Sequence, residues 1–116
     1  MTEVVNAGTT PKYTANLVDE DGVAIDAASL TTFTITVINL RTGAVINSRN
    51  RQNALNVNNV TISAGGLVTW SIQAADLPST QEEFFHVVFE WTWNAGAKAG
   101  WHDFALKVIP VPRPTV

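Results

Sequence analysis

The chain has 116 residues, a net charge of −3 and no cysteine. This length indicates one domain whose core can be stable without a disulfide or a structural metal. The lack of cysteine excludes both disulfides and thiolate metal sites. The negative charge argues against a nucleic-acid partner, because such binders present a basic patch, and a charged fraction of only 15% leaves the surface weakly protected against association.

The two ends of the chain lack the periodicity of helices or strands. The first twelve residues contain no basic segment followed by an apolar core, so we expect no signal peptide, and no apolar run in the chain is long enough to cross a bilayer. The other end carries Pro110, Pro112 and Pro114, and alternate prolines favour an extended form that blocks sheet pairing. We therefore expect an N-terminal arm at 1–12, a domain at 13–109 and a C-terminal arm at 110–116.

Strand patterns follow one another through the domain. Phe33, Ile35 and Val37 alternate with threonines, and a period of two with β-branched residues is typical of a strand. Trp70 alternates in the same way with its apolar neighbours two residues away. In chain order we expect a strand at 13–18, an acidic turn at 19–22, a strand at 32–40 and a turn at 41–43. Strands at 59–63 and 67–72 follow, joined by a turn at Gly65 and Gly66. After a loop at 74–83 we expect an aromatic strand that ends at Trp93 and a last strand at 102–109.

The aromatic segment at 82–96 reads mainly as a core strand. Alternate residues of a strand share a face, so the aromatic side chains from Phe85 to Trp93 point to one side, and His86 and Glu90 to the other. We expect it to pair antiparallel with the last strand, in a register that matches the two apolar faces. The expected pairs are Trp91 with Phe104, Phe89 with Leu106, Val87 with Val108 and Glu90 with Ala105.

These elements predict an all-β fold. With the apolar stretches that follow two of the turns, at Val23 and Ile25 and at 44–47, they amount to seven or eight short strands. Such strands, with turn signals roughly every ten residues and no helical periodicity, are typical of sandwiches. We expect a single antiparallel β-sandwich of immunoglobulin-like type, and a small barrel is the alternative.

The residues that carry chemistry form no catalytic or metal-binding pattern. His86 and His102 are expected on opposite faces, so they cannot share a metal, and the acidic turn at 19–22 lacks the full pattern of a calcium loop. The chain has no nucleophile elbow and no glycine-rich phosphate loop, and its acidic residues are spread over turns and arms. We therefore expect a protein that is not an enzyme and that holds no cofactor and no metal.

Arginines in an asparagine-rich segment are candidate contact residues. Between Asn47 and Asn59 an asparagine recurs at every third position, which is typical of a self-bonded loop that crosses between sheets. The alternative is a recognition loop in which Arg49 and Arg51 bind carboxylates of a partner with forked hydrogen bonds. Arg41 lies close to them in the sequence and belongs to the same candidate set.

Two tryptophans complete the candidates. Trp93 and Trp101 flank a glycine- and alanine-rich loop at 94–100, and a tryptophan at a loop rim is often an interface anchor. The alternative is that both rings cap the end of the core. With the three arginines and the prolines at 110, 112 and 114, these residues are the expected interface.

Four segments together resemble a known family. They are LVDEDGVAID at 17–26, TFTITVINLRTGAVIN at 32–47, GLVTWSIQAADLP at 66–78 and EFFHVVFEWTW at 83–93. The chain looks like the small immunoglobulin-like domains of tailed-bacteriophage virion proteins, including the N-terminal domain of baseplate upper proteins, over residues 13–109. Those domains have an early D-x-x-G turn, a strand matched here by Gly66 to Trp70, an acidic turn matched by Asp76, and an aromatic penultimate strand. The resemblance implies a structural role and no catalytic residue.

The resemblance leads to an expectation for function. The chain would be a non-enzymatic structural protein of a phage particle, made in the host cytoplasm and located in the virion, where it decorates or cements the capsid by adhesion through loops and arms. Its expected partners are the major capsid protein or neck and tail proteins, in a homo-oligomer or symmetric assembly, with no nucleic-acid or membrane partner. The alternatives are a neck, tail-adaptor or baseplate component and, from another class, a carbohydrate-binding module with Trp93 and Trp101 as a sugar platform.

Overall fold

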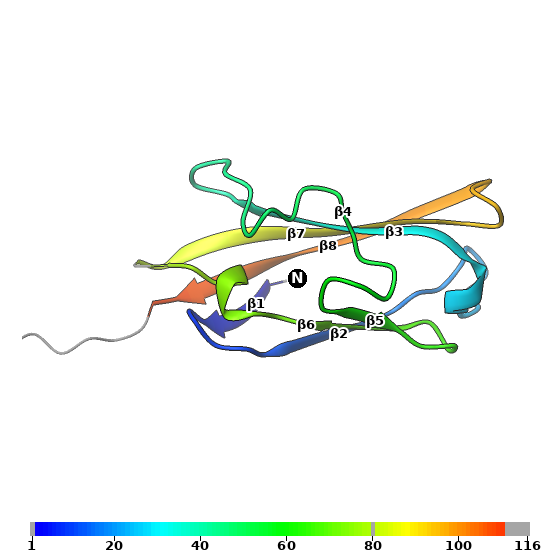
Figure 1. Ribbon diagram of the computed structural model, residues 1–116, viewed down its shortest axis with the longest axis horizontal. Coiled ribbons are helices and arrows are strands. Elements are labelled where there is room, and N and C mark those ends of the chain that lie inside the picture. The colour runs from blue at the N-terminus through cyan, green and yellow to red at the C-terminus, as the bar shows by residue number, and fades with distance from the viewer. Residues whose placement is uncertain (1, 80, 111–116) are drawn as a thin grey trace, which may run out of the picture.

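The computed structural model describes residues 2–79 and 81–110, which fold into two β-sheets packed face to face (Figure 1). In chain order the strands are β1 (Thr2–Asn6), β2 (Lys12–Asn16), β3 (Leu30–Asn39), β4 (Gln52–Asn53), β5 (Val60–Ile62), β6 (Leu67–Ser71), β7 (Glu83–Trp93) and β8 (Lys98–Ile109). Two single-turn 3-10 helices, η1 (Ala27–Ser29) and η2 (Ala74–Asp76), lie in connections. No helix in the described part of the chain is long and apolar enough to cross a membrane.

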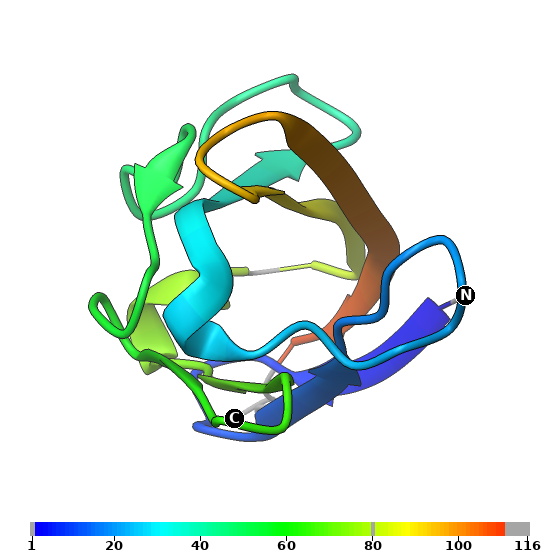
Figure 2. The same ribbon diagram turned by 90° about the vertical axis from the view of Figure 1, so that its right-hand side faces the viewer.

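The prediction of an all-β fold is confirmed. One sheet has five strands in the order β1-β8-β7-β3-β4, and the other has three in the order β2-β6-β5. Every strand pairing is antiparallel except that of β1 with β8, which is parallel. Seen along the long axis, the strands surround a single interior (Figure 2), and the buried apolar residues form one cluster there.

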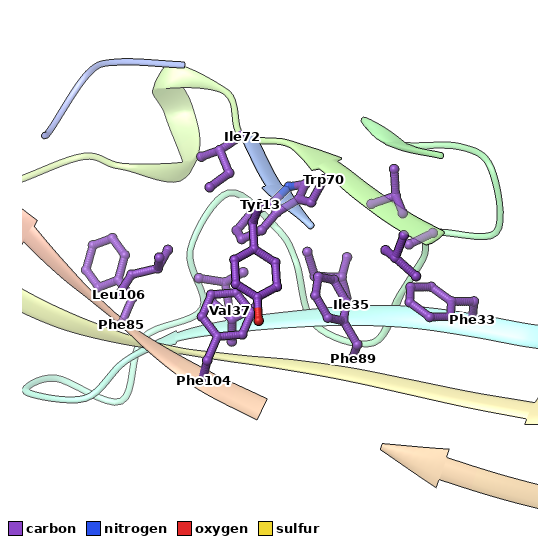
Figure 3. Packing of buried hydrophobic residues seen from close by; sticks show 14 of the residues in the cluster. Tyr13, Phe33, Ile35, Val37, Trp70, Ile72, Phe85, Phe89, Phe104 and Leu106 are labelled. Atoms are coloured by element: carbon purple, nitrogen blue, oxygen red, sulfur yellow. The ribbon is translucent and has the colours of Figure 1, made fainter. Parts of the chain in front are cut away.

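The core is built by the alternation that the sequence shows. Phe33, Ile35 and Val37 of β3 are fully buried, and so is Trp70 of β6 on the opposite sheet. Figure 3 shows side chains from both sheets meeting across the interior. The Trp70 and Phe89 rings pack edge to face with centroids 6.1 Å apart. Such aromatic pairs add about 0.5–1.5 kcal/mol beyond the free energy of area burial, so they hold the two sheets together.

The expected N-terminal arm is instead a strand. Residues 2–6 form β1 and pair in parallel with β8, from Thr2 opposite Ala105 to Asn6 opposite Ile109. The chain then turns at Gly8, whose φ is +72°, and enters the other sheet as β2. The segment has few apolar residues, so its pattern did not reveal a strand. It is ordered because the unpaired backbone edge of β8 supplies hydrogen-bond partners.

The pairing of β7 with β8 has the predicted faces but a different register. Val87 pairs with Phe104 and Trp91 pairs with Gly100, so every predicted pair is displaced by four residues along β8. The hairpin is tighter than expected, because the backbone takes positive φ at Asn94, Ala95 and Gly96 and turns between Trp93 and Lys98. A shift by an even number of residues keeps each side chain on its own face, so facial matching cannot detect it.

Three predicted turns are confirmed, and the turn at Gly66 also packs against the backbone of the segment between β2 and β3. Gly22, Gly43 and Gly66 each take positive φ, in the turns expected at 19–22, 41–43 and 65–66. Gly66 also packs against backbone: a Cβ there would lie 2.6 Å from the carbonyl oxygen of Ile25 and 3.0 Å from that of Leu17. Only glycine fits both the left-handed conformation and this close approach.

The variant Gly66→Ala should therefore lower the free energy of unfolding by at least about 2 kcal/mol, because left-handed strain and a backbone clash act together. Urea denaturation followed by tryptophan fluorescence measures this change as a lower midpoint at constant slope. Gly65→Ala is the matched control, since a Cβ at that position meets nothing closer than the Ser63 hydroxyl at 3.9 Å. Equal midpoints for the two variants would contradict the assignment.

Candidate interaction surface

The outer face of the five-stranded sheet, the side that points away from the three-stranded sheet, has two chemically different ends. One end lies near Phe84 at the start of β7, and the other near Glu90 and Trp101, where β7 approaches its hairpin. Glu90 lies six positions after Phe84 in β7, which corresponds to about 20 Å at a strand rise of roughly 3.3 Å per residue. The two ends can therefore serve different contacts.

The first end is an apolar patch of Val4, Leu40, Val45 and Phe84, whose exposed fractions lie between 41% and 66%. The register places them at one end of the sheet: Val4 and Phe84 lie on either side of Lys107 of β8, and Val45 pairs with Ile38, two residues before Leu40. The backbone N–H of Leu40 donates to the carbonyl oxygen of Phe84 over 2.9 Å. Leu40 and Phe84 are therefore direct neighbours, and several exposed apolar side chains at one end of a sheet in a charge-poor protein favour a contact surface. The sequence signal was that Phe84 falls on the outer face of β7 in the two-residue alternation of that strand.

The second end is a hollow of about 350 Å³ beside Trp101. Trp101 is 69% exposed and lies directly opposite Glu90 in the ladder. Arg51 reaches the hollow from the residue before β4, and its Nε lies 3.9 Å from Oε1 of Glu90. Thr32 and Thr92 are neighbours across β3 and β7, and their hydroxyl oxygens lie 2.7 Å apart. Sequence reasoning named Trp101 and Arg51, but it did not place them together or identify Glu90 as their neighbour.

Trp93 and Trp101 do not form one platform. Trp93 lies on the same, core-facing side of β7 as Trp91, is half-buried and packs against the core. Trp101 pairs with Glu90 and lies on the outer face with it. The expectation of a platform made by both rings is therefore wrong, because the hairpin register places them on opposite faces of the sheet. Trp93 instead packs against the core, so the alternative interpretation, that both rings cap the core, holds for Trp93 and not for the exposed Trp101.

Arg49 is buried, so the expectation that it reaches a partner is wrong. Its side chain is 2% exposed and pairs with Asp76, which has no exposed surface. Nε donates to Oδ1 of Asp76 over 2.5 Å and Nη2 donates to Oδ2 over 3.1 Å. The remaining N–H groups donate to the side chains of Gln52 and Asn59 and to the carbonyl oxygen of Asn58, so all five donors of the guanidinium are used.

The asparagine-rich segment is the expected self-bonded loop on both sides of the two-residue strand β4, and it wraps this ion pair. Within it, Nδ2 of Asn58 donates to the carbonyl oxygen of Asn53 over 2.6 Å. Asn47, Asn56, Asn58 and Asn59 all take positive φ, a conformation that asparagine tolerates. The Nδ2 group of Asn47 donates to Oδ1 of Asp76 over 2.8 Å, so the loop also satisfies the carboxylate. The loop carries the chain from β3 in one sheet to β5 in the other.

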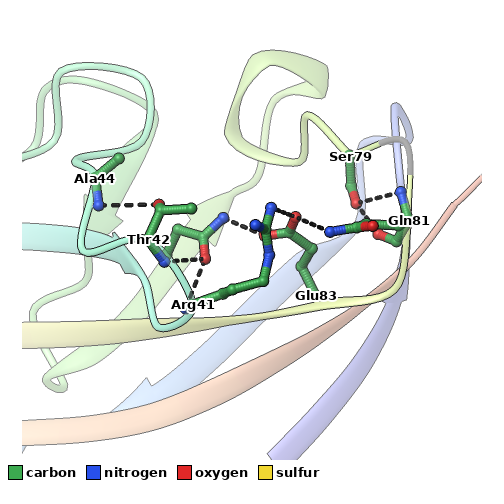
Figure 4. A network of polar contacts seen from close by, with 7 residues as sticks. Arg41, Thr42, Ala44, Ser79, Gln81 and Glu83 are labelled. Carbon is green, nitrogen blue, oxygen red and sulfur yellow. Dashed lines mark hydrogen bonds and ion pairs between the residues drawn. The ribbon is translucent and has the colours of Figure 1, made fainter.

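Arg41 and Arg51 are the arginines of the candidate set that remain at the surface. Arg41 is 58% exposed and donates through Nη2 to Oε1 of Glu83, which is itself buried. Asn39 and Gln81 donate to the same carboxylate, so the network in Figure 4 ties the end of β3 to the start of β7. The hydrogen bond from Arg41 holds the pKa of Glu83 below its ordinary value of 4.5. Arg51 is 78% exposed and keeps most of its donors free for a ligand.

The two histidines lie on opposite faces of β7 and β8, as predicted. On the outer face, Nε2 of His86 lies 2.8 Å from Oδ2 of Asp103, and this hydrogen bond lowers the pKa of that carboxyl. On the core side, Nε2 of His102 lies 2.8 Å from the hydroxyl of Tyr13, whose pKa is raised mainly by burial. Among residues 2–79 and 81–110, no three His, Asp or Glu side chains converge in a way that would hold a metal.

The prolines of the expected interface lie at the edge of the described chain. Pro110 follows the last residue of β8. Pro112 and Pro114 lie outside the described residues, so their expected role stays a prediction. Comparison with known proteins finds no family model, no curated protein and no solved structure that matches this chain.

Removing the Arg49 side chain should unfold the protein more easily than removing any exposed arginine. In Arg49→Ala the carboxylate of Asp76 is left buried without its counter-charge, which typically costs about 3–5 kcal/mol. Arg51→Ala is the matched control, because surface substitutions usually change stability by no more than about 0.5 kcal/mol. Urea midpoints compare the two variants, and an unchanged midpoint for Arg49→Ala would show that the ion pair does not hold the loop.

The Glu83 network should make stability depend on pH. Because its pKa is lowered in the folded state, Glu83 stabilises the fold above its ordinary value of 4.5, and this contribution is lost as the pH falls through the lowered pKa. Glu83→Gln should therefore lower the urea midpoint at neutral pH, and the difference from the parent protein should shrink in acid. Glu82→Gln is the control, since Glu82 is 54% exposed and forms a surface ion pair with Lys107, at 3.6 Å. A difference in urea midpoint between Glu83→Gln and the parent protein that stays constant with pH would contradict the role of the carboxylate.

Proposed function

We propose that this chain is a non-enzymatic structural protein of a bacteriophage particle, a capsid decoration or cement protein that attaches to neighbouring virion proteins. The observation that carries the proposal is the apolar patch on the outer face of the five-stranded sheet. Val4, Leu40, Val45 and Phe84 together expose apolar surface in a chain with few charges to keep it apart from other proteins. The mechanism is adhesion, and no chemical step is required.

The strand order supports the immunoglobulin-like part of the proposal. In immunoglobulin-like sandwiches one sheet contains strands C, F and G, and variable-type domains add C′ next to C. Strands B, E and D belong to the other sheet. The five-stranded sheet here matches the first arrangement through β3, β7, β8 and β4, and the three-stranded sheet matches the second through β2, β6 and β5. The described chain has eight strands rather than about seven, because β1 joins β8 as an extra edge. A shared fold does not by itself imply a shared function, so the argument for adhesion rests on the surface.

The attachment mechanism changes from the one that the sequence led us to expect. Residues 2–6 belong to the sheet, so this segment cannot serve as a free arm that embraces a neighbour. In our proposal the outer face of the five-stranded sheet takes over that role, with the C-terminal residues from Pro110 onward as the remaining candidate arm. In a symmetric assembly many copies bind at once, so weak individual contacts add up through multivalency.

Copy number separates this proposal from its nearest alternative. A neck, tail-adaptor or baseplate component would be present in the number of a single ring, whereas a decoration protein would approach the number of major capsid proteins or a simple fraction of it. Quantitative mass spectrometry of purified particles measures this ratio. Absence of the chain from particles would overturn both versions of the proposal. The remaining alternative, a carbohydrate-binding module, is weakened in its original form because Trp93 and Trp101 face opposite ways.

The variant Phe84→Asp should reduce attachment to particles by tenfold or more. A charge placed in the centre of a desolvated contact costs about 2 kcal/mol or more, which exceeds a factor of ten in affinity. Val57→Asp is the matched control, because Val57 is also 43% exposed but lies in the asparagine-rich loop, away from the patch. The measurement is the copy number of each variant per particle. Attachment of Phe84→Asp at the parent level would show that the patch is not the contact.

A further inference from the structure

The hollow beside Trp101 combines features that the adhesion proposal does not use. Its floor is made of short side chains, because Thr32, Thr92 and Ala99 lie side by side across β3, β7 and β8. The adjacent row across the sheet contains Glu90 and Trp101, whose longer side chains rise beside this floor. The result is a shallow hollow of about 350 Å³, near the lower end of the roughly 300–1,000 Å³ that small-molecule sites occupy.

The indole ring of Trp101 is the first of these features. It is 69% exposed, although burial of a tryptophan is strongly favourable and the other three tryptophans are buried or half-buried. An indole offers a large, rigid face with negative charge density. The polarised C–H groups on one side of a sugar ring are attracted to such a face.

The charged pair opposite the indole is the second feature. Arg51 and Glu90 are 78% and 44% exposed, and their nearest charged atoms lie 3.9 Å apart, too far for a hydrogen bond. The guanidinium therefore has donors to offer, and the carboxylate has acceptors. Because the two charges cancel, the site favours a neutral ligand that can both donate and accept hydrogen bonds. Adjacent hydroxyl groups of a saccharide meet this requirement, since each hydroxyl does both.

The threonine hydroxyls are the third feature. The oxygens of Thr32 and Thr92 use one donor between them, at 2.7 Å, and each keeps further hydrogen-bonding capacity toward the hollow. An apolar protein segment would leave these hydroxyls and the Arg51–Glu90 pair desolvated and without partners, which is unfavourable. A polyhydroxylated ring would satisfy them.

We propose that the hollow beside Trp101 binds one sugar ring of a neutral saccharide. The ring stacks on the Trp101 indole, and its hydroxyl groups bond to Arg51, Glu90 and the threonines of the floor. This site is separate from the apolar patch, about 20 Å away along β7 by the strand rise, so sugar binding and attachment to a particle can be tested independently. A decoration protein built in this way would hold its neighbour at one end of the sheet and display a saccharide site at the other.

NMR titration of the ¹⁵N-labelled protein tests the site. The probes are neutral disaccharides, namely maltose, cellobiose, lactose and N,N′-diacetylchitobiose, added to millimolar concentration. The indole N–H signal of Trp101 is identified among the four tryptophans by its loss in Trp101→Phe. We expect a saturable shift of this signal, and of the backbone signals of Glu90 and Thr92, with at least one probe. If no probe shifts them, the proposal is overturned.

Variants distinguish a built site from a passive surface. Trp101→Ala should weaken binding by about tenfold or more, because stacking on an aromatic ring and the burial of its area are both lost. Glu90→Gln and Arg51→Ala should each weaken it by a smaller factor. Phe84→Ala is the matched control, since it removes another exposed aromatic ring of the same outer face but lies at the far end. Equal affinity of Trp101→Ala and the parent protein would overturn the site.

The two proposals fail in different measurements. Loss of particle attachment in Phe84→Asp with sugar binding intact would leave the saccharide site standing. Loss of attachment in Trp101→Ala, with no response of the parent protein to any disaccharide, would show that the hollow contacts a protein and not a sugar. The amide spectrum of each variant confirms that it is folded before affinity is compared.

Discussion

The ion pair between Arg49 and Asp76 is the constraint on which much of the structure depends. Asp76 stands in the connection from β6 to β7, and Arg49 in the connection from β3 to β4, so their contact ties together two connections that lie far apart in the sequence. The guanidinium also lies over the Trp70 ring, with its carbon 5.7 Å from the ring centroid. A buried charge is tolerated only when every donor and acceptor finds a partner, and here the asparagine-rich loop supplies those partners. The loop conformation therefore follows from the charge it encloses.

With the loop arginine engaged inside, both of our proposals rest on the outer face of the five-stranded sheet. It has a division of chemistry along β7, from apolar side chains around Phe84 to the aromatic and polar hollow at Trp101. The middle of the face carries the His86–Asp103 pair. A sheet presents both ends in a fixed relation, which suits the two contacts that we propose. Our two proposals, protein attachment and saccharide binding, use this division without competing for the same residues.

Some of the candidate residues named from the sequence are exposed and others are buried, and the difference has a physical origin. Trp101 and Arg51 were candidates, and both are exposed at the hollow. Arg49 was grouped with Arg51 because only one residue separates them, yet Arg51 takes positive φ and its side chain points outward, whereas that of Arg49 points inward. Nothing local distinguishes an arginine that will be buried from one that will be exposed. The distinguishing partner, Asp76, is 27 residues away.

Local pattern by itself determined that this protein is all-β, which side chains of β3, β6, β7 and β8 face the core, and where the glycine turns lie. These properties follow from the two-residue period of a strand and from the backbone freedom of glycine, and both act over a few residues. Only the tertiary structure decided the register of β7 with β8, the recruitment of residues 2–6 as a strand and the separation of Trp93 from Trp101. Each of these depends on which distant backbone edge or charge is available as a partner. A strand's own alternation is unchanged by an even shift, so it cannot select among such partners.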